Sequence, residues 1–236
     1  MATTRARGRW MARYARWHIW LGWLVGVPRL LWTLCGLAMI ARPIEEVRGD
    51  HLRVASPPER LPAGFAIMPA PVAGGTTPVE LRTFVQRGRP VTLATAAGGE
   101  VTRYDARTGA ALPPVDAAEA RRIVAAGIRG GRNVTALEAF AADAPPLGLR
   151  KAIATWRATL ADGTHVYIDR ATGEIAAVRT RWWRIYDFFW GLHIMDLETR
   201  EDAHNPFTLA FGGLALAATL LGFVLLFRRR KGRARA

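Results

Sequence analysis

The sequence predicts an α+β domain held between two membrane-spanning helices, and three observations lead to this prediction. Two long apolar segments, residues 19–41 and 207–227, lie near the ends of the 236-residue chain. All 19 acidic residues fall between these segments, whereas the basic excess lies outside them. The enclosed region repeats one pattern of strands and turns, and a helical pattern separates the two copies.

Each apolar segment is long enough to cross the ~30 Å hydrocarbon core of a bilayer as an α-helix. Arginines precede the first segment and a basic run follows the second, in both cases without an acidic residue. The first segment is longer than the ~7–15 residues of a signal-peptide core and lacks a clean cleavage site, so we interpret it as a retained anchor. Because basic flanks mark the cytoplasmic side, we expect both termini in the cytoplasm and the central domain outside it.

The net charge of +14 is concentrated in the two tails. A strongly basic chain often binds nucleic acid. Here the charge lies beside the apolar segments, where it sets orientation and meets anionic lipid. We therefore expect membrane lipid, and no nucleic acid, as a partner. The one cysteine, Cys35, excludes an intrachain disulfide and a cysteine-based metal cluster.

The central region contains a turn pattern twice, 64 residues apart. Asp105 and Gly109 in the first copy correspond to Asp169 and Gly173 in the second. The pattern Asp-x-x-Thr-Gly supplies side-chain caps and a left-handed glycine to a tight turn. Because an aspartate repeated in the same local setting indicates architecture, we interpret these four residues as structural turn residues and not as catalytic acids.

Each copy reads as a hairpin followed by this turn and a short apolar stretch. The expected strands are 91–95 and 100–104 in the first copy and 156–160 and 164–168 in the second, with an additional edge strand over 79–85. Between the copies, Asp116 and Glu119 resemble a capping box, and apolar residues follow at helical spacing until Gly130-Gly131. Such a helix would cover one face of an antiparallel sheet.

The chain resembles the PepSY-associated transmembrane proteins. Residues 167–175 resemble the end of a PepSY module, residues 16–22 resemble the family's first span, and Leu192-His193 resembles its Leu-His element. The resemblance covers most of the chain. It implies an extracytoplasmic domain of two PepSY-like repeats, the first of them degenerate, anchored in a bacterial inner membrane and facing the periplasm. Larger members with more spans reduce ferric siderophores with b-type haem, and other PepSY modules bind or inhibit partners.

These observations divide the chain into seven segments. They are a basic cytoplasmic tail (1–18), a first transmembrane helix (19–41), the first PepSY-like repeat (42–112), a helix with the second repeat (113–180), an aromatic interfacial helix (181–206), a second transmembrane helix (207–227) and a basic cytoplasmic tail (228–236).

One helical face of the first span is a candidate haem site. His18, Gly22, Gly26 and Arg29 fall within about 80° of one another at 3.6 residues per turn. Histidine is an axial haem ligand, glycines leave room for a macrocycle, and an arginine inside a span would meet a propionate or a partner helix. The alternative is a Gly-x-x-x-Gly packing motif beside an interfacial histidine. Since the other histidines near a span lie about 30 Å away at the outer edge, a haem would require His18 from two subunits or a second ligand other than histidine.

A second candidate site lies before the last span. The aromatic run at residues 182–193 is typical of a helix in the membrane interface. His193 and His204 could together bind a metal, and Asp196 is close enough in sequence to orient the His193 ring.

The sequence contains no signature of a hydrolase, a dinucleotide-binding enzyme or a phosphate-binding loop. We therefore expect no catalytic residues and interpret the chain as a periplasmic binding or accessory module without an assigned cofactor. It would act as a homodimer or with a neighbouring membrane complex. The alternative is a membrane oxidoreductase that transfers electrons through haem b and is related to ferric-siderophore reductases.

Overall fold

The structure is a computed structural model that describes residues 2–55, 57, 59–68 and 77–233. It divides into two compact units. The helical unit comprises residues up to 43 and from 185 onward, and the α+β unit comprises residues 44–184. The helical unit contains α1 (Ala2–Ile40), most of α4 (Arg181–His193) and α5 (Pro206–Arg233). The elements of the α+β unit are α2 (Ile44–Arg48), a 3-10 helix η1 (Asp50–Leu52), β1 (Pro78–Gln86), β2 (Arg89–Ala96), β3 (Val101–Asp105), α3 (Ala117–Gly127), β4 (Val134–Phe140), β5 (Thr155–Leu160), β6 (His165–Asp169) and β7 (Ile175–Arg179).

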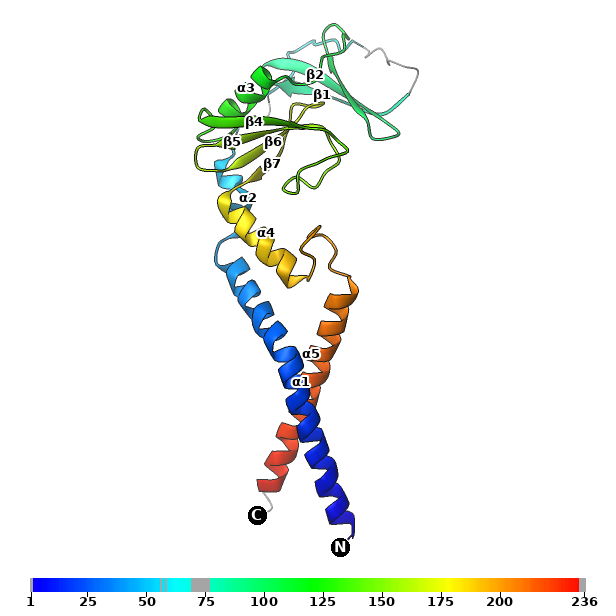
Figure 1. The fold of residues 1–236 in the computed structure, drawn as a ribbon. Coiled ribbons are helices and arrows are strands. Elements are labelled where there is room, and N and C mark those ends of the chain that lie inside the picture. Colours follow the sequence, from blue (N-terminus) through cyan, green and yellow to red (C-terminus); the bar gives the residue numbers. More distant parts are fainter. Residues whose placement is uncertain (1, 56, 58, 69–76, 234–236) are drawn as a thin grey trace. The chain divides into compact units, whose positions relative to one another are not determined.

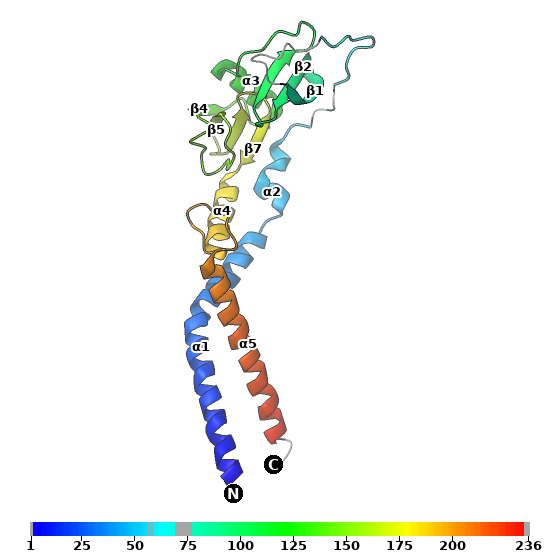
Figure 2. The same ribbon diagram turned by 90° about the vertical axis from the view of Figure 1, so that its right-hand side faces the viewer.

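Two helices of the helical unit are long and apolar enough to cross a bilayer. Their apolar parts are Arg13–Ile40 of α1 and Pro206–Phe227 of α5, with mean hydropathies of 1.6 and 2.3. Only 11% and 6% of these stretches are buried, which distinguishes them from core helices of a soluble protein. The two helices run antiparallel and pack against each other (Figure 1, Figure 2). Both helices continue beyond the expected spans into the basic tails at 1–18 and 228–236.

Partly or fully buried residues recur along α1 and α5 at alternating intervals of three and four residues, and we call this set of residues the seam. A spacing of 3.5 residues keeps one stripe of each helix facing its partner. The seam contains small residues on α5, which let the two helices approach closely. Its residues are His18, Leu21, Val25, Pro28, Trp32, Cys35 and Met39 on α1, and Thr208, Phe211, Ala215, Ala218, Gly222 and Leu225 on α5.

The α+β unit contains two antiparallel sheets, with strand orders β1-β2-β3 and β4-β5-β6-β7. The expected fold class, two candidate transmembrane helices that flank antiparallel sheets and a helix, is therefore confirmed. All five expected strands are present, but the sequence prediction missed β4 and described β7 only as a short apolar stretch. A loop at residues 141–154 separates β4 from β5, so no short turn marked this pair as a hairpin.

The two predicted turns have the same geometry in the two copies of the repeat. Asp105 Oδ1 accepts hydrogen bonds from the backbone N–H groups of Arg107 and Thr108 at 2.8 and 3.2 Å. Asp169 Oδ1 accepts from the equivalent N–H groups of Ala171 and Thr172 at 2.8 and 3.3 Å. Gly109 and Gly173 have φ angles of 72° and 69°, a conformation that glycine adopts at little cost. These contacts support the interpretation of the four residues as structural.

The offset of 64 residues extends beyond these turns. With this offset, β3 at residues 101–105 aligns in sequence with β6 at residues 165–169. It also maps the isolated bridge between Tyr104 and Ala111 onto the pairing of Ile168 with Ile175, where β7 begins. The first copy therefore retains only one bridge of the strand that is complete as β7 in the second copy.

Helix α3 begins where the sequence predicts and ends earlier. Asp116 caps its start, since Oδ1 accepts from the N–H of Glu119 at 2.7 Å. The helix ends at Gly127 and not at Gly130-Gly131, because Ile128 takes an extended conformation and forms an antiparallel bridge with Arg53. The apolar face of α3 packs on the four-stranded sheet. This core contains Val115, Ala120, Ile123, Val124, Ile128, Ala158, Leu160, Val166, Ile168 and Val178.

A buried ion pair connects the first copy of the repeat to α3. The Arg103 side chain is 5% exposed, and its Nη1 and Nη2 lie 3.1 and 3.3 Å from the two carboxylate oxygens of Glu119. Arg103 Nη2 also donates to the carbonyl of Pro113 at 3.2 Å. A bidentate pair of this kind fixes both position and orientation of the two side chains.

The end of β1 and the turn after it contact the second copy directly. Gln86 Nε2 donates to the carbonyl of Thr172 at 2.9 Å, and Arg87 Nη1 donates to the carbonyl of Gly173 at 3.1 Å. Both acceptors belong to the Asp-x-x-Thr-Gly turn of the second copy. This turn therefore also serves as the attachment point of the first sheet.

Replacing Gly173 by alanine should destabilise the α+β unit more than replacing Gly99 by alanine. Both glycines have positive φ, which costs about 1 kcal/mol or more with a side chain. A Cβ at Gly173 would in addition lie 2.9 Å from Arg103 Nη1, whereas no atom lies within 4 Å of a Cβ at Gly99. Thermal unfolding of the full-length protein in detergent, followed by near-UV circular dichroism, measures the difference. Equal decreases in the melting temperature of the two variants would contradict the close approach of a Cβ at Gly173 to Arg103.

Glu119→Ala should lower the free energy of unfolding by about 3 kcal/mol, because it leaves the buried Arg103 guanidinium without its counter-charge. Glu138→Ala is the matched control. It removes a carboxylate 2.7 Å from Arg157 Nη2 that is 49% exposed, and it should cost about 0–1 kcal/mol. Urea unfolding of the two variants under one buffer condition compares them, and similar costs would show that the Arg103 pair contributes no more than a surface pair.

Candidate functional site

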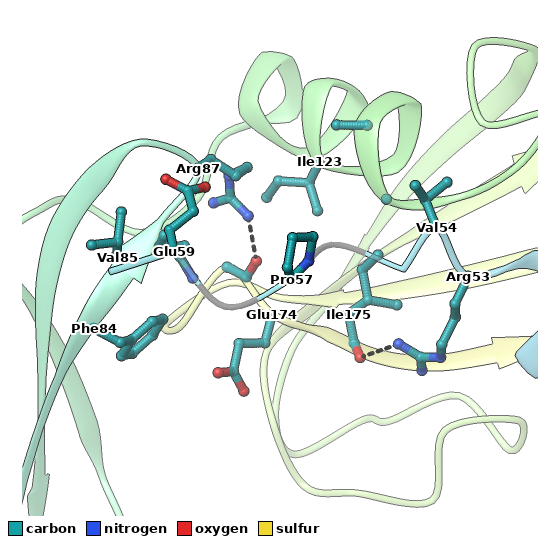
Figure 3. A pocket seen from close by; sticks show the side chains of 14 residues that line it. Arg53, Val54, Pro57, Glu59, Phe84, Val85, Arg87, Ile123, Glu174 and Ile175 are labelled. Atoms are coloured by element: carbon teal, nitrogen blue, oxygen red, sulfur yellow. Dashed lines mark hydrogen bonds between the residues drawn. The ribbon is translucent and has the colours of Figure 1, made fainter. Parts of the chain in front are cut away.

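An open groove lies in the α+β unit at the junction of the two repeat copies (Figure 3). Its volume is about 510 Å³. Four parts of the chain line it: the end of β1, the second half of α3, the turn between β6 and β7, and the segment that follows η1. The contacts of Gln86 and Arg87 with the second turn hold the sides of this groove at their spacing.

Apolar side chains form much of the groove lining. Val54, Val85, Ile123 and Ile175 come from four different parts of the chain, and Phe84 extends the apolar surface along β1. Ile123 belongs to the buried core of the unit and is 3% exposed, so the groove floor is continuous with the core. A floor of this kind is typical of small concave binding sites.

Charged side chains of both signs stand around this floor. Arg53 and Arg87 are basic, and Glu59 and Glu174 are acidic. Glu59 accepts hydrogen bonds from the N–H of Gly88 at 3.0 and 3.2 Å, and Arg53 Nη1 reaches the carbonyl of Ile175 at 3.5 Å. The rim is thus electrically balanced and partly ordered by backbone contacts.

Burial lowers the pKa of the Arg87 guanidinium from its ordinary value, and the nearby Glu119 carboxylate opposes this shift. Glu174 lies 3.6 Å from Arg82 across an exposed pair. The described lining contains no histidine, cysteine, serine, lysine or tyrosine side chain. The charged groups of the described lining are two guanidinium groups and two carboxylates.

Edge strands border the groove on two sides. β1 is the first strand of its sheet and β7 is the last strand of the other, and both contribute residues to the lining. In the described part of the chain, no strand pairs with the outer side of either one. An edge strand can pair with a further extended segment, although the carbonyl of Ile175 on β7 already accepts from Arg53.

The structure separates the four residues of the candidate haem face. His18 belongs to the seam, where its Cε1 lies 3.0 Å from the position of a Cβ on Gly222. Arg29 Nη1 donates to Thr219 Oγ1 at 2.8 Å. Gly22 and Gly26 lie outside the seam, and no atom is within 4 Å of a Cβ on either residue. The ring of His18 therefore contacts α5, whereas the space beside Gly22 and Gly26 is not filled by α5.

Two histidine ligands for one iron do not meet among the described residues. The His18 ring packs against Gly222, and its buried Nδ1 has no hydrogen-bond partner. The His193 ring packs on Trp32, with ring centroids 5.7 Å apart. Trp32 lies fourteen residues, or about 21 Å, along the helix from His18. A bis-histidine haem within a single chain does not fit this arrangement.

His193 and His204 flank a loop that other residues hold in place. The carbonyl of His193 accepts from Trp32 Nε1 at 2.6 Å, whereas its Nδ1 is buried and has no partner. The expectation that Asp196 orients this ring is wrong, because Asp196 accepts from the backbone N–H groups of Thr199, Glu201 and Asp202. Hydrogen bonds from Thr199 are the main reason why the pKa of Asp196 is lowered.

His204 is exposed, and its backbone N–H donates to Asp202 Oδ1 at 2.8 Å. Across the described ranges, no group of three or more histidine, cysteine, aspartate or glutamate side chains could hold a metal ion. A metal held by His193 and His204 alone stays a prediction.

Sequence reasoning missed a buried ion pair in the helical unit. Asp187 on α4 is 3% exposed, and its Oδ2 accepts from Arg200 Nη1 at 2.6 Å. The carbonyl of Arg200 in turn accepts from Trp190 Nε1 at 3.1 Å. One acidic residue within the aromatic run was the available signal, since a charge among so many aromatic residues requires a partner.

His165 on β6 is half-buried, and its ring meets the edge of Tyr167 at a centroid distance of 6.5 Å. Burial lowers the pKa of this imidazole, and the neighbouring Arg184 and Arg157 add to the shift. The residue does not line the groove.

Comparison with known proteins supports a family assignment. A family model described as the PepSY-associated TM region matches residues 15–236. No curated protein and no solved structure matches the chain. The matched region includes both apolar helices and the whole α+β unit, which is nearly the full length. The chain is therefore a membrane-associated protein that belongs to the PepSY-associated TM region family.

Proposed function

We propose that the protein is a membrane-anchored binding module that holds an extended peptide segment of a partner in the groove of its α+β unit. The observation that carries the proposal is the position of two edge strands, β1 and β7, along an apolar groove with charges of both signs on its rim. An extended peptide can pair with an edge strand through its backbone while alternate side chains enter a pocket.

The size and chemistry of the groove support a peptide over a highly charged ligand. A volume of about 510 Å³ holds a few side chains. The rim offers two arginines and two glutamates, so it can meet either sign of charge on a peptide but does not concentrate one sign. The apolar floor between them supplies the burial that drives association.

The membrane helices serve as an anchor in this proposal, with both termini in the cytoplasm and the α+β unit in the periplasm of an inner membrane. The basic residues in the first turns of α1 and at the end of α5 support this orientation, because such residues are retained on the cytoplasmic side. A periplasmic groove would meet exported or membrane-bound partners.

Two reporter fusions test the orientation. Alkaline phosphatase fused after Gly131 should be active, because it forms its disulfides only outside the cytoplasm. Green fluorescent protein fused after Ala236 should fluoresce in the cytoplasm. Exchanging the two reporters is the control and should abolish both signals. An inactive phosphatase at Gly131, with normal amounts of fusion protein, would place the α+β unit in the cytoplasm.

Filling the groove should abolish peptide binding. Ala126 lines the groove on α3, whereas Ala118 is an exposed alanine on the same helix outside it. A peptide selected from a random twelve-residue display library on the full-length protein in nanodiscs is the probe. Ala126→Trp should weaken its binding at least tenfold, because an indole would occupy the floor, and Ala118→Trp should leave binding unchanged.

Fluorescence anisotropy of the labelled peptide measures these affinities. Unchanged binding to the Ala126→Trp variant would remove the groove from the proposal. A library that enriches no peptide above empty nanodiscs would contradict peptide binding itself.

A further inference from the structure

A second stripe of residues runs along α1 beside the seam. Gly22, Gly26, Arg29, Thr33 and Gly36 follow one another at intervals of four, three, four and three residues, so they share one side of the helix. A Cβ atom on any of the three glycines would meet no atom within 4 Å. α5 therefore does not cover the glycines of this stripe.

Arg29 lies in the middle of the apolar stretch. It is ten residues from Ile19 and eleven from Ile40, so about 15 Å of helix separates it from either end. This distance exceeds the length of an extended arginine side chain. A guanidinium at such a depth is costly in hydrocarbon and is retained where a partner compensates its charge.

The contacts within the chain leave this charge uncompensated. Arg29 Nη1 donates one hydrogen bond to the neutral hydroxyl of Thr219 at 2.8 Å. Thr33 Oγ1 donates to the backbone carbonyl of Arg29 at 3.0 Å, and it is likewise a neutral hydroxyl. In the described parts of the chain, no carboxylate forms an ion pair with Arg29.

A second copy of the chain cannot supply the missing charge from its spans. Residues 1–44 and 203–236 contain no aspartate or glutamate, so neither α1 nor α5 carries a carboxylate side chain. A dimer through the glycine stripe would also bring two Arg29 guanidinium groups toward each other. A carboxylate at the depth of Arg29 would therefore have to come from a different molecule.

We propose that the glycine stripe docks a transmembrane helix of another protein, and that this helix presents an aspartate or glutamate to Arg29 near the middle of the bilayer. The three glycines let the partner backbone approach closely. An arginine can hold a carboxylate through two parallel hydrogen bonds, and Nη1 alone is engaged by Thr219. This site lies in the helical unit and is independent of the proposed peptide groove.

A model helix tests the proposal with the full-length protein in nanodiscs. The probe is a labelled polyleucine transmembrane peptide with one glutamate at its centre, and the matched probe carries leucine at that position. Resonance energy transfer to a dye on the C-terminus of the protein measures association. The glutamate peptide should bind at least tenfold more tightly than the leucine peptide.

Arg29→Gln should abolish this preference, because glutamine can still donate to Thr219 but carries no charge. Arg16→Leu, which removes an exposed arginine near the cytoplasmic end of α1, should preserve it. Gly22→Ile should weaken both peptides by blocking close approach. A preference for glutamate that is absent, or that survives in Arg29→Gln, would overturn the proposal.

Two further results would also overturn it. A homodimer of the wild-type protein that Arg29→Gln dissociates would assign the stripe to a second copy. A haem absorbance band that disappears in Arg29→Gln would assign the guanidinium to a porphyrin propionate.

Discussion

The backbone carbonyl groups of the turn at residues 169–173 hold the first copy of the repeat against the second. The carbonyls of Thr172 and Gly173 accept hydrogen bonds from the side chains of Gln86 and Arg87 of the first copy. The carbonyl of Arg170 accepts from the N–H of Val115, just before α3, at 2.8 Å. A tight turn directs several carbonyls outward, where its own strands cannot use them. The second sheet therefore offers a ready set of acceptors to the first, and the groove lies where the two sheets meet.

The association of α1 with α5 in the helical unit depends on different forces. Between helices in lipid, close packing and a few hydrogen bonds replace the hydrophobic effect as the source of association. The small residues of α5 and the seam spacing meet this requirement between α1 and α5. Both spans lack acidic residues, so neither α1 nor α5 can neutralise the charge of Arg29. We propose above that another molecule supplies the carboxylate.

Local features of the fold were predictable from the sequence, and features that join distant segments were not. The repeated turn, the Asp116 cap and the apolar spans depend on residues a few positions apart, so spacing alone reveals them. β4 was missed because a long loop separates it from its partner. The groove was missed because residues 54, 85, 123 and 175 converge only after both sheets have formed.

For the candidate haem face, a helical wheel predicted which residues share an arc of α1 but not which of them contact α5. The wheel correctly placed His18, Gly22, Gly26 and Arg29 within a limited arc. It could not tell which part of that arc α5 would occupy, and the seam divides the four residues. Arg29 was nevertheless identified from sequence, because an arginine inside an apolar segment requires an explanation in any fold.

Equivalent positions of the two copies have taken different roles. Arg103 and Tyr167 occupy the same place in the repeat, and both are buried, at 5% and 2% exposure. One forms the ion pair with α3, and the other packs with Leu149 in a small apolar cluster. A duplication of one ancestral half would account for this pair, but the halves are no longer interchangeable. A domain built from two identical second halves would lack the guanidinium that pairs with Glu119 of α3, so its first sheet would lose this attachment to the helix.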